Sequence, residues 1–330
     1  MRIALNGFGR IGRTVLRQVL TRADCADIEV ALLNDIAPIE TCAYLFRYDS
    51  VFGPYPGKVE AEIGALALDG RSIPFTQEPD LGALDLSGID LVMDCTGTIH
   101  TRAQAARGLS AGAKNVLISG PCPEAERTIV LGANDETLGT ARIVSNASCT
   151  TNALAPLLRA IDDALGIASG HSTTIHCYTG SQPMVDAPRG DLARSRAGAV
   201  SMVPTTTSAT RLVDHVLPQI AGRVSGAAVR VPVISVSAID AVLHLKRALP
   251  SDVEGFLRTL AAASPVLGAT EDATVSTDLR ARPESLVIAL PETQVVGAHQ
   301  LRVFGWYDNE WGFSARMIDV ARRMVARDQA

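Results

Sequence analysis

The sequence predicts an α/β protein in which a parallel sheet wound with helices is followed by an α+β part with a mainly antiparallel sheet. Three observations lead to this fold class. Strand-like apolar runs alternate with helical patterns through the first 148 residues, which is typical of a parallel sheet with crossover helices. A glycine-rich turn joins the first strand to the first helix. Further along, strand-like runs at 227–233 and 234–247, rich in β-branched residues, follow each other directly, which favours a mainly antiparallel sheet.

Composition limits the class of protein. A length of 330 residues favours two domains, and 47% hydrophobic with only 4% aromatic residues predicts aliphatic cores. The net charge of −5 gives no reason to expect nucleic acid or an anionic membrane as a partner. The six cysteines are scattered without a CxxC pair, which fits reduced thiols, and no leader or membrane-spanning pattern is recognisable. We therefore expect a cytoplasmic protein.

The first element is a strand at 2–6, followed by the turn Gly7-Phe-Gly-Arg-Ile-Gly12 and an amphipathic helix from Arg13. This is the GxGxxG pattern in its required setting of strand, turn and helix. Gly7 permits the tight turn, Gly9 lets the backbone approach a pyrophosphate, and Gly12 lets the helix pack on the strand. Phe8, Arg10 and Ile11 complete the loop.

A second strand, at 28–33, ends just before Asp35, which follows Gly12 by 23 residues (35 − 12). An acid at this spacing binds the ribose hydroxyls of a dinucleotide and repels the 2′-phosphate of NADP. The first half is thus predicted to be a Rossmann domain that binds NAD.

The alternation continues to residue 148. We expect a helix at 41–48, a hairpin of 58–63 and 65–68, a strand at 89–93, a helix at 103–110, a strand at 115–119 and a last strand ending at Val144. Ligands bind beyond the carboxyl ends of parallel strands, so Thr96 and Ser119 should face the cofactor. For each of these two, an ordinary turn position is the alternative.

The segment 142–152 ends a strand and opens a helix, predicted at 149–165, with Cys149 at its first position. Unpaired N–H groups and the helix dipole stabilise a thiolate there. Pro156 predicts a kink. A strand at 171–178 carries His176, which could take the thiol proton, whereas His171 lies five positions away and faces the other side, which argues against a metal pair.

The remaining segments suggest substrate recognition. The polar loop 180–198 is long enough to be functional, and the hydroxyl-rich turn 203–208 before a helix is a candidate anion site. Arg230 stands among apolar residues and needs an anionic partner, either a substrate phosphate or an internal acid. We expect a helix from 251, a strand at 293–306, a turn at 308–312 and a helix at 313–326.

A nucleophilic cysteine, a histidine and a dinucleotide site together indicate oxidation of an aldehyde through a thioester. A thiolate adds to the aldehyde, and the resulting hemithioacetal can give up a hydride because it collapses to a stable thioester. A cysteine hydrolase would need no dinucleotide fold, and an alcohol dehydrogenase would need no cysteine nucleophile.

The sequence closely resembles the phosphorylating glyceraldehyde-3-phosphate dehydrogenase family over essentially its whole length. The motifs that carry the resemblance are Asn6-Gly-Phe-Gly-Arg-Ile-Gly-Arg13, Arg47-Tyr-Asp-Ser50, Ser145-Asn-Ala-Ser-Cys-Thr-Thr-Asn152, Thr173-Thr-Ile-His176, Arg230-Val-Pro232 and Trp306-Tyr-Asp-Asn-Glu-Trp-Gly312. The block around Cys149 is the most specific of them.

The resemblance implies the roles of individual residues. Cys149 would be the nucleophile, His176 its base and thiolate partner, and Asn309 the ligand of the nicotinamide carboxamide. The implied phosphate-site positions are Ser148, Thr150, Thr207 and the neighbouring Ser208 for one anion, Thr179 and Arg230 for the other, and Arg194 near both.

The resemblance also implies NAD as cofactor, a phosphorylated aldehyde and inorganic phosphate as substrates, and a homotetramer in which the loop 180–198 packs near a neighbouring subunit's cofactor. The expected domains are an NAD-binding domain at 1–148 and a catalytic domain at 149–311, with the helix within 312–330 returning to the first domain.

Several positions depart from the family pattern, and they cluster around phosphate recognition. Ser181 stands where an acid is usual, and Ser208 replaces a glycine, so its Cβ occupies the approach of a phosphate to the backbone. Two alternatives therefore accompany the leading interpretation. One is the sister activity on erythrose 4-phosphate, in which water cleaves the thioester. The other is a diverged NAD-binding paralogue with a non-catalytic role.

Overall fold

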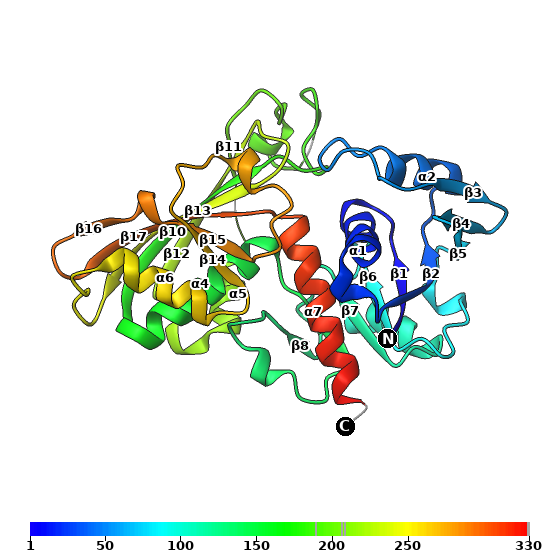
Figure 1. The fold of residues 1–330 in the computed structure, drawn as a ribbon, viewed down its shortest axis with the longest axis horizontal. Helices are drawn as coiled ribbons and strands as arrows, with labels where there is room; N and C mark the ends of the chain where they lie inside the picture. Colours follow the sequence, from blue (N-terminus) through cyan, green and yellow to red (C-terminus); the bar gives the residue numbers. More distant parts are fainter. Residues whose placement is uncertain (189, 206, 208, 329–330) are drawn as a thin grey trace. The chain divides into compact units, whose positions relative to one another are not determined.

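The computed structural model describes residues 1–188, 190–205, 207 and 209–328, and these form two compact units (Figure 1). Unit 1 contains Met1–Ile129, Glu136–Ser148 and the described residues from Ser314 onward. Unit 2 contains Val130–Asp135 and the described residues of Cys149–Phe313. Each unit has its own sheet.

The sheet of unit 1 has the order β3-β4-β5-β2-β1-β6-β7-β9-β8. Its strands are β1 (Arg2–Asn6), β2 (Glu29–Asn34), β3 (Val59–Glu62), β4 (Ala65–Leu68), β5 (Arg71–Thr76), β6 (Leu91–Asp94), β7 (Asn115–Ile118), β8 (Arg127–Thr128) and β9 (Ile143–Ser145). Strands β5-β2-β1-β6-β7-β9 are parallel, in the Rossmann order with a reversal of winding between β1 and β6. This confirms the predicted fold class for the first half.

The expected hairpin is present as β3 and β4, but β5 adds a third strand that the sequence analysis did not include. Its segment contains Pro74, which removes a backbone donor and weakens the strand pattern. Only Ile73 and Phe75 are buried along β5, so the apolar signal is also short.

The helices of unit 1 are α1 (Arg10–Thr21), α2 (Ile39–Arg47), α3 (Arg102–Ser110) and most of α7 (Trp311–Arg327). A capping box starts α3, in which Thr101 accepts from the N–H of Gln104. Side chains of α7 bind other segments of unit 1. Arg322 lies 3.0 Å from Asp27, and Arg327 donates to Oδ1 of Asn115 in β7 at 3.0 Å.

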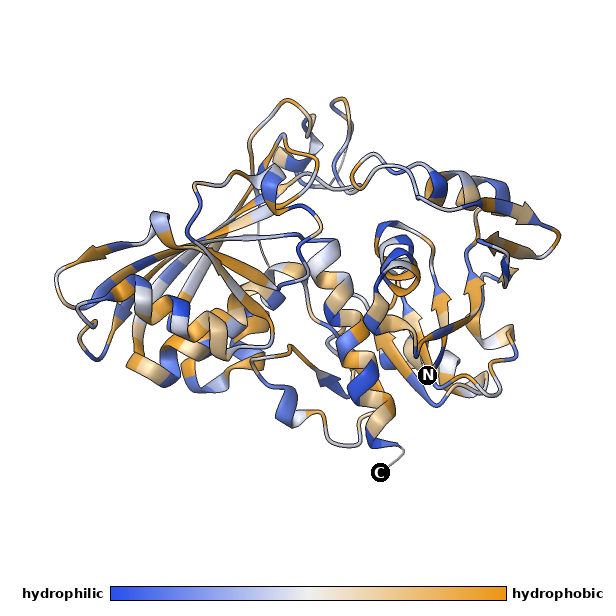
Figure 2. Ribbon diagram, viewed as in Figure 1, coloured by the Kyte–Doolittle hydropathy of each residue, from blue (hydrophilic) through white to orange (hydrophobic). Residues whose placement is uncertain are grey.

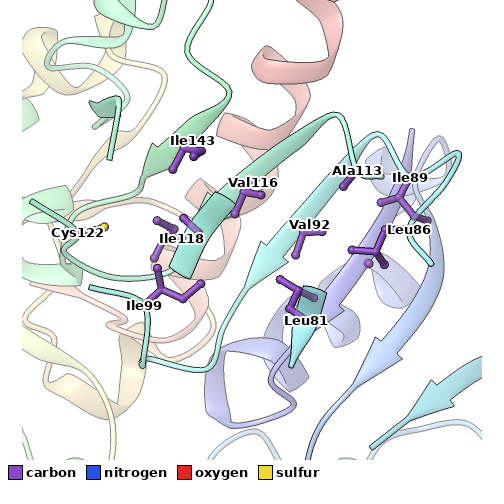
Figure 3. Close-up of a cluster of buried hydrophobic side chains, with 12 residues drawn as sticks. Leu81, Leu86, Ile89, Val92, Ile99, Ala113, Val116, Ile118, Cys122 and Ile143 are labelled. Carbon is purple, nitrogen blue, oxygen red and sulfur yellow. The ribbon is translucent and has the colours of Figure 1, made fainter. Parts of the chain in front are cut away.

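The core of unit 1 is aliphatic, as its composition predicts. Figure 3 shows Val92, Val116 and Ile143 from neighbouring strands together with the side chains that pack on them. The central strands are coloured as hydrophobic in Figure 2, because both of their faces are covered in a doubly wound sheet. This rigid layer fixes the strand ends from which the site residues project.

The sheet of unit 2 has the order β11-β12-β10-β13-β17-β15-β14, with β16 paired to β17. Its strands are β10 (Ile167–Cys177), β11 (Val203–Thr205), β12 (Val224–Val231), β13 (Ser237–Leu245), β14 (Leu267–Thr270), β15 (Leu286–Ala289), β16 (Gln294–Val296) and β17 (Gln300–Tyr307). Among the described pairs, β10–β12 and β14–β15 are parallel and the others are antiparallel. The mainly antiparallel sheet is therefore confirmed.

The strands of this half differ in detail from the predicted ones. The runs at 227–233 and 234–247 correspond to β12 and β13, and β10 lies between these two strands in the sheet. The chain turns between them, with Val236 at a φ of +66°. The single strand expected at 293–306 is a hairpin of β16 and β17, because Gly297, at a φ of +59°, reverses the chain.

The helices of unit 2 are α4 (Cys149–Leu165), α5 (Ala209–Val216) and α6 (Val253–Ala263). Helix α4 continues through Pro156 and buries Leu154, Leu157 and Leu158. Short 3₁₀ turns occur in the two units at Ala23–Cys25, Leu81–Ala83, Asp135–Thr137, Ala193–Ser195, Pro218–Ile220, Ser276–Leu279 and Leu290–Glu292. Among the helices of the described residues, none combines the length and apolar content needed to cross a membrane.

Candidate active site

The glycine loop of unit 1 is shaped by steric requirements. Gly7 has a φ of +90°, and a Cβ there would lie 2.6 Å from the backbone nitrogen of Thr96. A Cβ on Gly12 would lie 2.1 Å from the carbonyl oxygen of Gly7. A Cβ on Gly9 would meet no atom of the described residues within 4 Å apart from those of its own chain neighbours, so the space in front of it is open in the described part of the chain. That open space, at the N-terminus of α1, suits an approaching phosphate.

A pocket of about 520 Å³ lies at the carboxyl ends of β1, β2 and β6, where the winding reverses. Its lining residues are Asn6, Gly7, Gly9, Asn34, Asp35, Ile36, Glu78, Pro79, Leu81, Asp94, Cys95, Thr96, Thr98, Ile99, Gln104 and Arg107. This is the position at which doubly wound sheets bind dinucleotides. The pocket and the open glycine loop fit the ADP half of NAD.

Asp35 is held in place at the edge of this pocket. Its Oδ2 accepts from the backbone N–H of Phe8 at 2.5 Å, and its Oδ1 accepts from the N–H of Ala37 at 2.8 Å. The carboxylate thus ties the second strand to the glycine loop and is presented to the pocket with a fixed orientation.

A network of hydrogen-bonded side chains that line the pocket joins the ends of three strands. Nδ2 of Asn6 and Oγ1 of Thr96 each donate to Asp94 at 2.6 Å, and Nδ2 of Asn34 donates to Oδ1 of Asn6 at 2.8 Å. Asp94 is only 1% exposed, and burial raises the pKa of its carboxyl group. This hydrogen-bond network holds the side chain of Thr96 at the wall of the pocket. The strand ends were predicted from sequence, whereas these hydrogen bonds were not.

Four other residues predicted to bind the cofactor, Phe8, Arg10, Ile11 and Ser119, are not among the residues that line this pocket. Phe8 is buried and stacks on Phe46, so only its backbone is available to a ligand. Nη1 of Arg10 donates to Oδ2 of Asp49 at 2.5 Å. Ile11 lies in the first turn of α1, and Ser119 follows β7 and donates its N–H to the carbonyl oxygen of Asp94.

In unit 2, Cys149 is the first residue of α4, and its Sγ lies 3.5 Å from Nε2 of His176 on β10. Burial raises the pKa of the thiol, while Arg230 and the hydroxyl and N–H groups of Thr150 act in the opposite direction. The sulfur and the imidazole are within the reach needed for proton transfer. The structure therefore brings together the two residues predicted to be catalytic.

His176 is 5% exposed, and its other ring nitrogen has two neighbours. Nδ1 lies 2.7 Å from the carbonyl oxygen of Cys177 and 2.6 Å from Nη1 of Arg230. Burial, followed by the charge of Arg230, lowers the pKa of His176 to about 4. The ring is neutral near pH 7. In the tautomer in which Nδ1 donates to the carbonyl oxygen of Cys177 and does not accept from Arg230, the lone pair of Nε2 faces the thiol and can accept its proton.

Thr150 is engaged in a buried hydroxyl network. The hydroxyl of Tyr307 lies 2.9 Å from Oγ1 of Thr150 and 2.8 Å from Oγ1 of Thr174. Thr174 in turn donates to the carbonyl oxygen of Ala238 at 3.2 Å. Tyr307 belongs to the motif at 306–312, but the sequence alone predicts no role for it. The network joins the second residue of α4 to β10 and to the end of β17.

Strand register places the candidate anion ligands near His176. His176 pairs with Arg230 on β12, and Arg230 pairs with Val203 on β11. Nε of Arg194 donates to Oγ1 of Thr205, two residues along β11, at 2.7 Å. Among the described residues no carboxylate pairs with Arg230, so the internal acid considered as its partner is not found there.

The hydroxyl residues of the expected anion sites have local partners. Oγ1 of Thr179 lies 2.9 Å from Oγ of Ser181, the departure from the family pattern. Oγ1 of Thr207 accepts from the N–H of Ala209 at 3.0 Å, which caps the start of α5. Ser148 immediately precedes Cys149 and is half-buried. Ser208 lies outside the described residues.

Comparison with known proteins agrees with this geometry. A family model described as glyceraldehyde 3-phosphate dehydrogenase, NAD binding domain, matches residues 1–102, and one described as the C-terminal domain matches residues 148–309. The glyceraldehyde-3-phosphate dehydrogenase of Cereibacter sphaeroides is 44% identical to the chain over 328 residues, covering 98% of each. The proteins of that name from Xanthobacter flavus, at 44%, and Pseudomonas aeruginosa, at 43%, cover 98% and 99% of this chain and 98% of their own lengths. The chain therefore belongs to the glyceraldehyde-3-phosphate dehydrogenase family.

Proposed function

We propose that the protein catalyses the NAD-dependent, phosphorylating oxidation of D-glyceraldehyde 3-phosphate to 1,3-bisphosphoglycerate. The observation that carries this proposal is the thiol of Cys149 at the N-terminus of α4, with Sγ 3.5 Å from Nε2 of His176. The relatives named above all bear the name of this activity, and unit 1 offers a site that fits NAD.

The first chemical step joins the Cys149 sulfur to the aldehyde carbon. His176 accepts the thiol proton on Nε2 as the C–S bond forms and passes it to the former carbonyl oxygen, which gives a hemithioacetal. His176 then removes that hydroxyl proton while the hydride leaves the same carbon. NAD, when bound, accepts the hydride. The product on Cys149 is a thioester, and one proton has been released.

A phosphate oxygen then attacks the thioester carbon, and the C–S bond breaks to release the acyl phosphate and the Cys149 thiolate. Arg230 and the Thr150 groups, which act against the rise that burial causes in the pKa of Cys149, stabilise the leaving thiolate. Since Arg230 stands on the strand beside His176, it is suited to hold an anion during this step.

We assign the binding residues as follows. Gly7, Phe8, Gly9, Arg10, Ile11 and Gly12 form the NAD loop, with Asp35 at the adenosine ribose, Thr96 and Ser119 beside the cofactor, and Asn309 at the nicotinamide carboxamide. Ser148, Thr150, Thr207 and Ser208 serve one anion, Thr179 and Arg230 the other, and Arg194 lies near both. The open space at Gly9 and the guanidinium of Arg230 support these assignments most directly.

We also propose that unit 1 is the NAD-binding domain, that unit 2 is the catalytic domain, and that the protein is a cytoplasmic homotetramer. The segment 184–202 supports assembly because its large apolar side chains are unusually exposed. They are Met184, Val185, Leu192, Val200 and Met202, each at least 73% exposed. Light scattering after size-exclusion chromatography measures the mass, and a monomer at micromolar concentration would contradict the tetramer.

The test of the activity is NADH formation by the purified protein. Glyceraldehyde 3-phosphate is supplied with and without inorganic phosphate, and erythrose 4-phosphate is supplied in parallel. We expect turnover that requires phosphate and prefers the triose, and none from Cys149→Ser. Turnover that is indifferent to phosphate, or faster on the tetrose, would replace the proposal with the erythrose-4-phosphate activity.

A further inference from the structure

Two buried side chains donate hydrogen bonds to the side-chain amide of Asn309. The thiol of Cys177 and the hydroxyl of Ser237 both donate to Oδ1 of Asn309, each at 3.1 Å. Cys177 and Ser237 are each 1% exposed, and Asn309 is 7% exposed. The three residues come from β10, from the start of β13 and from the turn between β17 and α7.

The direction of these hydrogen bonds follows from the donors. The hydroxyl of Ser237 accepts from the backbone N–H of Cys177 at 3.1 Å and donates its own hydrogen to Oδ1 of Asn309 at 3.1 Å. Burial raises the pKa of the Cys177 thiol to about 12, so the sulfur keeps its proton near neutral pH. The amide oxygen can accept from both donors, whereas Nδ2, which only donates, could accept from neither. The amide nitrogen Nδ2 is therefore turned away from both.

The backbone of the turn around Asn309 is also fixed. Oδ1 of Asp308 accepts from the N–H groups of Glu310 and Trp311, at 3.0 and 2.9 Å. Oδ2 of Asp308 accepts from the N–H of Ala281 at 2.8 Å. With the backbone held by Asp308, the remaining freedom of Asn309 is rotation of its side chain, and the two donors on Oδ1 restrict that rotation.

We infer that Cys177 and Ser237 are positioning residues that orient Asn309, so that Nδ2 is the atom it offers to the carboxamide of NAD. The inference rests on the proposed function, in which Asn309 binds that carboxamide. No hydrogen bond of Nδ2 is formed within the described residues, whereas Oδ1 uses both of its lone pairs. A free amide donor complements the carboxamide oxygen, and a rotated amide would offer an acceptor instead.

The test compares two ligands that differ only by the nicotinamide. Dissociation constants for NAD and for ADP-ribose are measured by isothermal titration calorimetry on the full chain and its variants. Removing one of the two donors should loosen the amide. We expect Cys177→Ala and Ser237→Ala each to weaken the affinity for NAD about fivefold, the effect of losing one neutral hydrogen bond. The affinity for ADP-ribose should stay within about twofold of the wild-type value.

Cys177→Ser keeps a donor at the same position and should restore most of the NAD affinity lost in Cys177→Ala. Cys25→Ala is the matched control, because Cys25 is also 1% exposed but belongs to unit 1, whereas Asn309 belongs to unit 2. It should bind both ligands as the wild type does. Rescue by serine is a result that a merely space-filling role of Cys177 would not give.

Other outcomes would overturn the inference. These are unchanged NAD affinity in both alanine variants, or equal weakening of NAD and ADP-ribose, which would indicate a general disturbance of the protein. A wild-type protein that binds no NAD would overturn both the inference and the proposed function. A protein that oxidises no aldehyde, yet loses NAD affinity selectively in the alanine variants, would contradict the proposed function and support the positioning role.

Discussion

Nη1 of Arg230 lies 2.6 Å from Nδ1 of His176, and the two residues are register partners on the parallel strands β12 and β10. The guanidinium also donates to the carbonyl oxygen of Cys177 at 3.1 Å. A permanent positive charge in this position disfavours protonation of His176 and favours ionisation of Cys149. Arg230 is therefore part of the electrostatics of the nucleophile as well as a candidate anion ligand.

Arg230→Met should raise the pKa values of both Cys149 and His176, because the positive charge is removed while most of the side-chain volume remains. The measurement is the rate of iodoacetamide alkylation of Cys149 against pH, followed by peptide mass spectrometry. We expect the alkylation profile to move to higher pH. Arg223→Met is the control, because Arg223 donates to the carbonyl oxygen of Ile167 instead of contacting His176. An unmoved profile in Arg230→Met would contradict this account.

His176→Asn should lower the rate of NADH formation by about 10²- to 10⁴-fold, the usual contribution of a general base. NAD affinity should stay within about twofold, since the chemical step is affected rather than the dinucleotide site. Single-turnover kinetics with saturating aldehyde report the step directly. A rate equal to that of the wild type would remove His176 from the mechanism.

The burial of His176 also predicts a pH-dependent stability. The pKa of His176 is about 4 in the folded protein and near 6.5 in an unfolded chain, so the unfolded state binds more protons between these values. The contribution of the neutral His176 to the free energy of unfolding is fully present above pH 6.5. It is lost as the pH falls toward 4, by up to about 3 kcal/mol. Urea unfolding at pH 7 and pH 4.5 should show a larger loss for the wild type than for His176→Asn. Equal losses in the two proteins would count against a buried neutral imidazole.

Tyr307→Phe should lower the free energy of unfolding by about 1–3 kcal/mol, because the buried hydroxyls of Thr150 and Thr174 lose a shared partner. Urea unfolding measures the change. Tyr44→Phe is a suitable control, since Tyr44 is 61% exposed, and it should change stability by less than about 0.5 kcal/mol. If the two substitutions cost the same, the network has no measurable energetic role.

Asp35→Asn should shift the cofactor preference toward NADP. The change removes the negative charge that repels a 2′-phosphate and keeps an oxygen that can accept from the N–H of Phe8 or Ala37. We expect the ratio of kcat/KM for NAD to that for NADP to fall by about tenfold or more, since each 1.4 kcal/mol corresponds to a factor of ten. An unchanged ratio would show that other residues select NAD.

The parts of the site that could be predicted from sequence depend on local structure. The glycine turn from Gly7 to Gly12 and the helix opened by Cys149 are each contained in one short segment with a strict residue pattern. The contact between Cys149 and His176 required only that one strand follow one helix. For the same reason the parallel sheet of unit 1 and the helices on it could be predicted from alternation.

The parts that could not be predicted depend on contacts between distant segments. Thr150 and Tyr307 are 157 positions apart, and Cys177 and Asn309 are 132 positions apart. Their pairing depends on strand order, which local sequence patterns do not determine. Once β10 is placed between those strands, Arg230 stands beside His176 and Ser237 stands beside Cys177.

The alternation of side chains along β10 limits the changes that this strand can accept. His176 is directed to Cys149, while Cys177, the next residue, is bonded to Asn309. An insertion or deletion of one residue just before His176 would exchange the two faces, turning the imidazole toward Asn309 and the thiol toward Cys149. Length variation should therefore be excluded from this stretch in any functional homologue or designed variant, whereas the polar loop that follows it is free of that constraint.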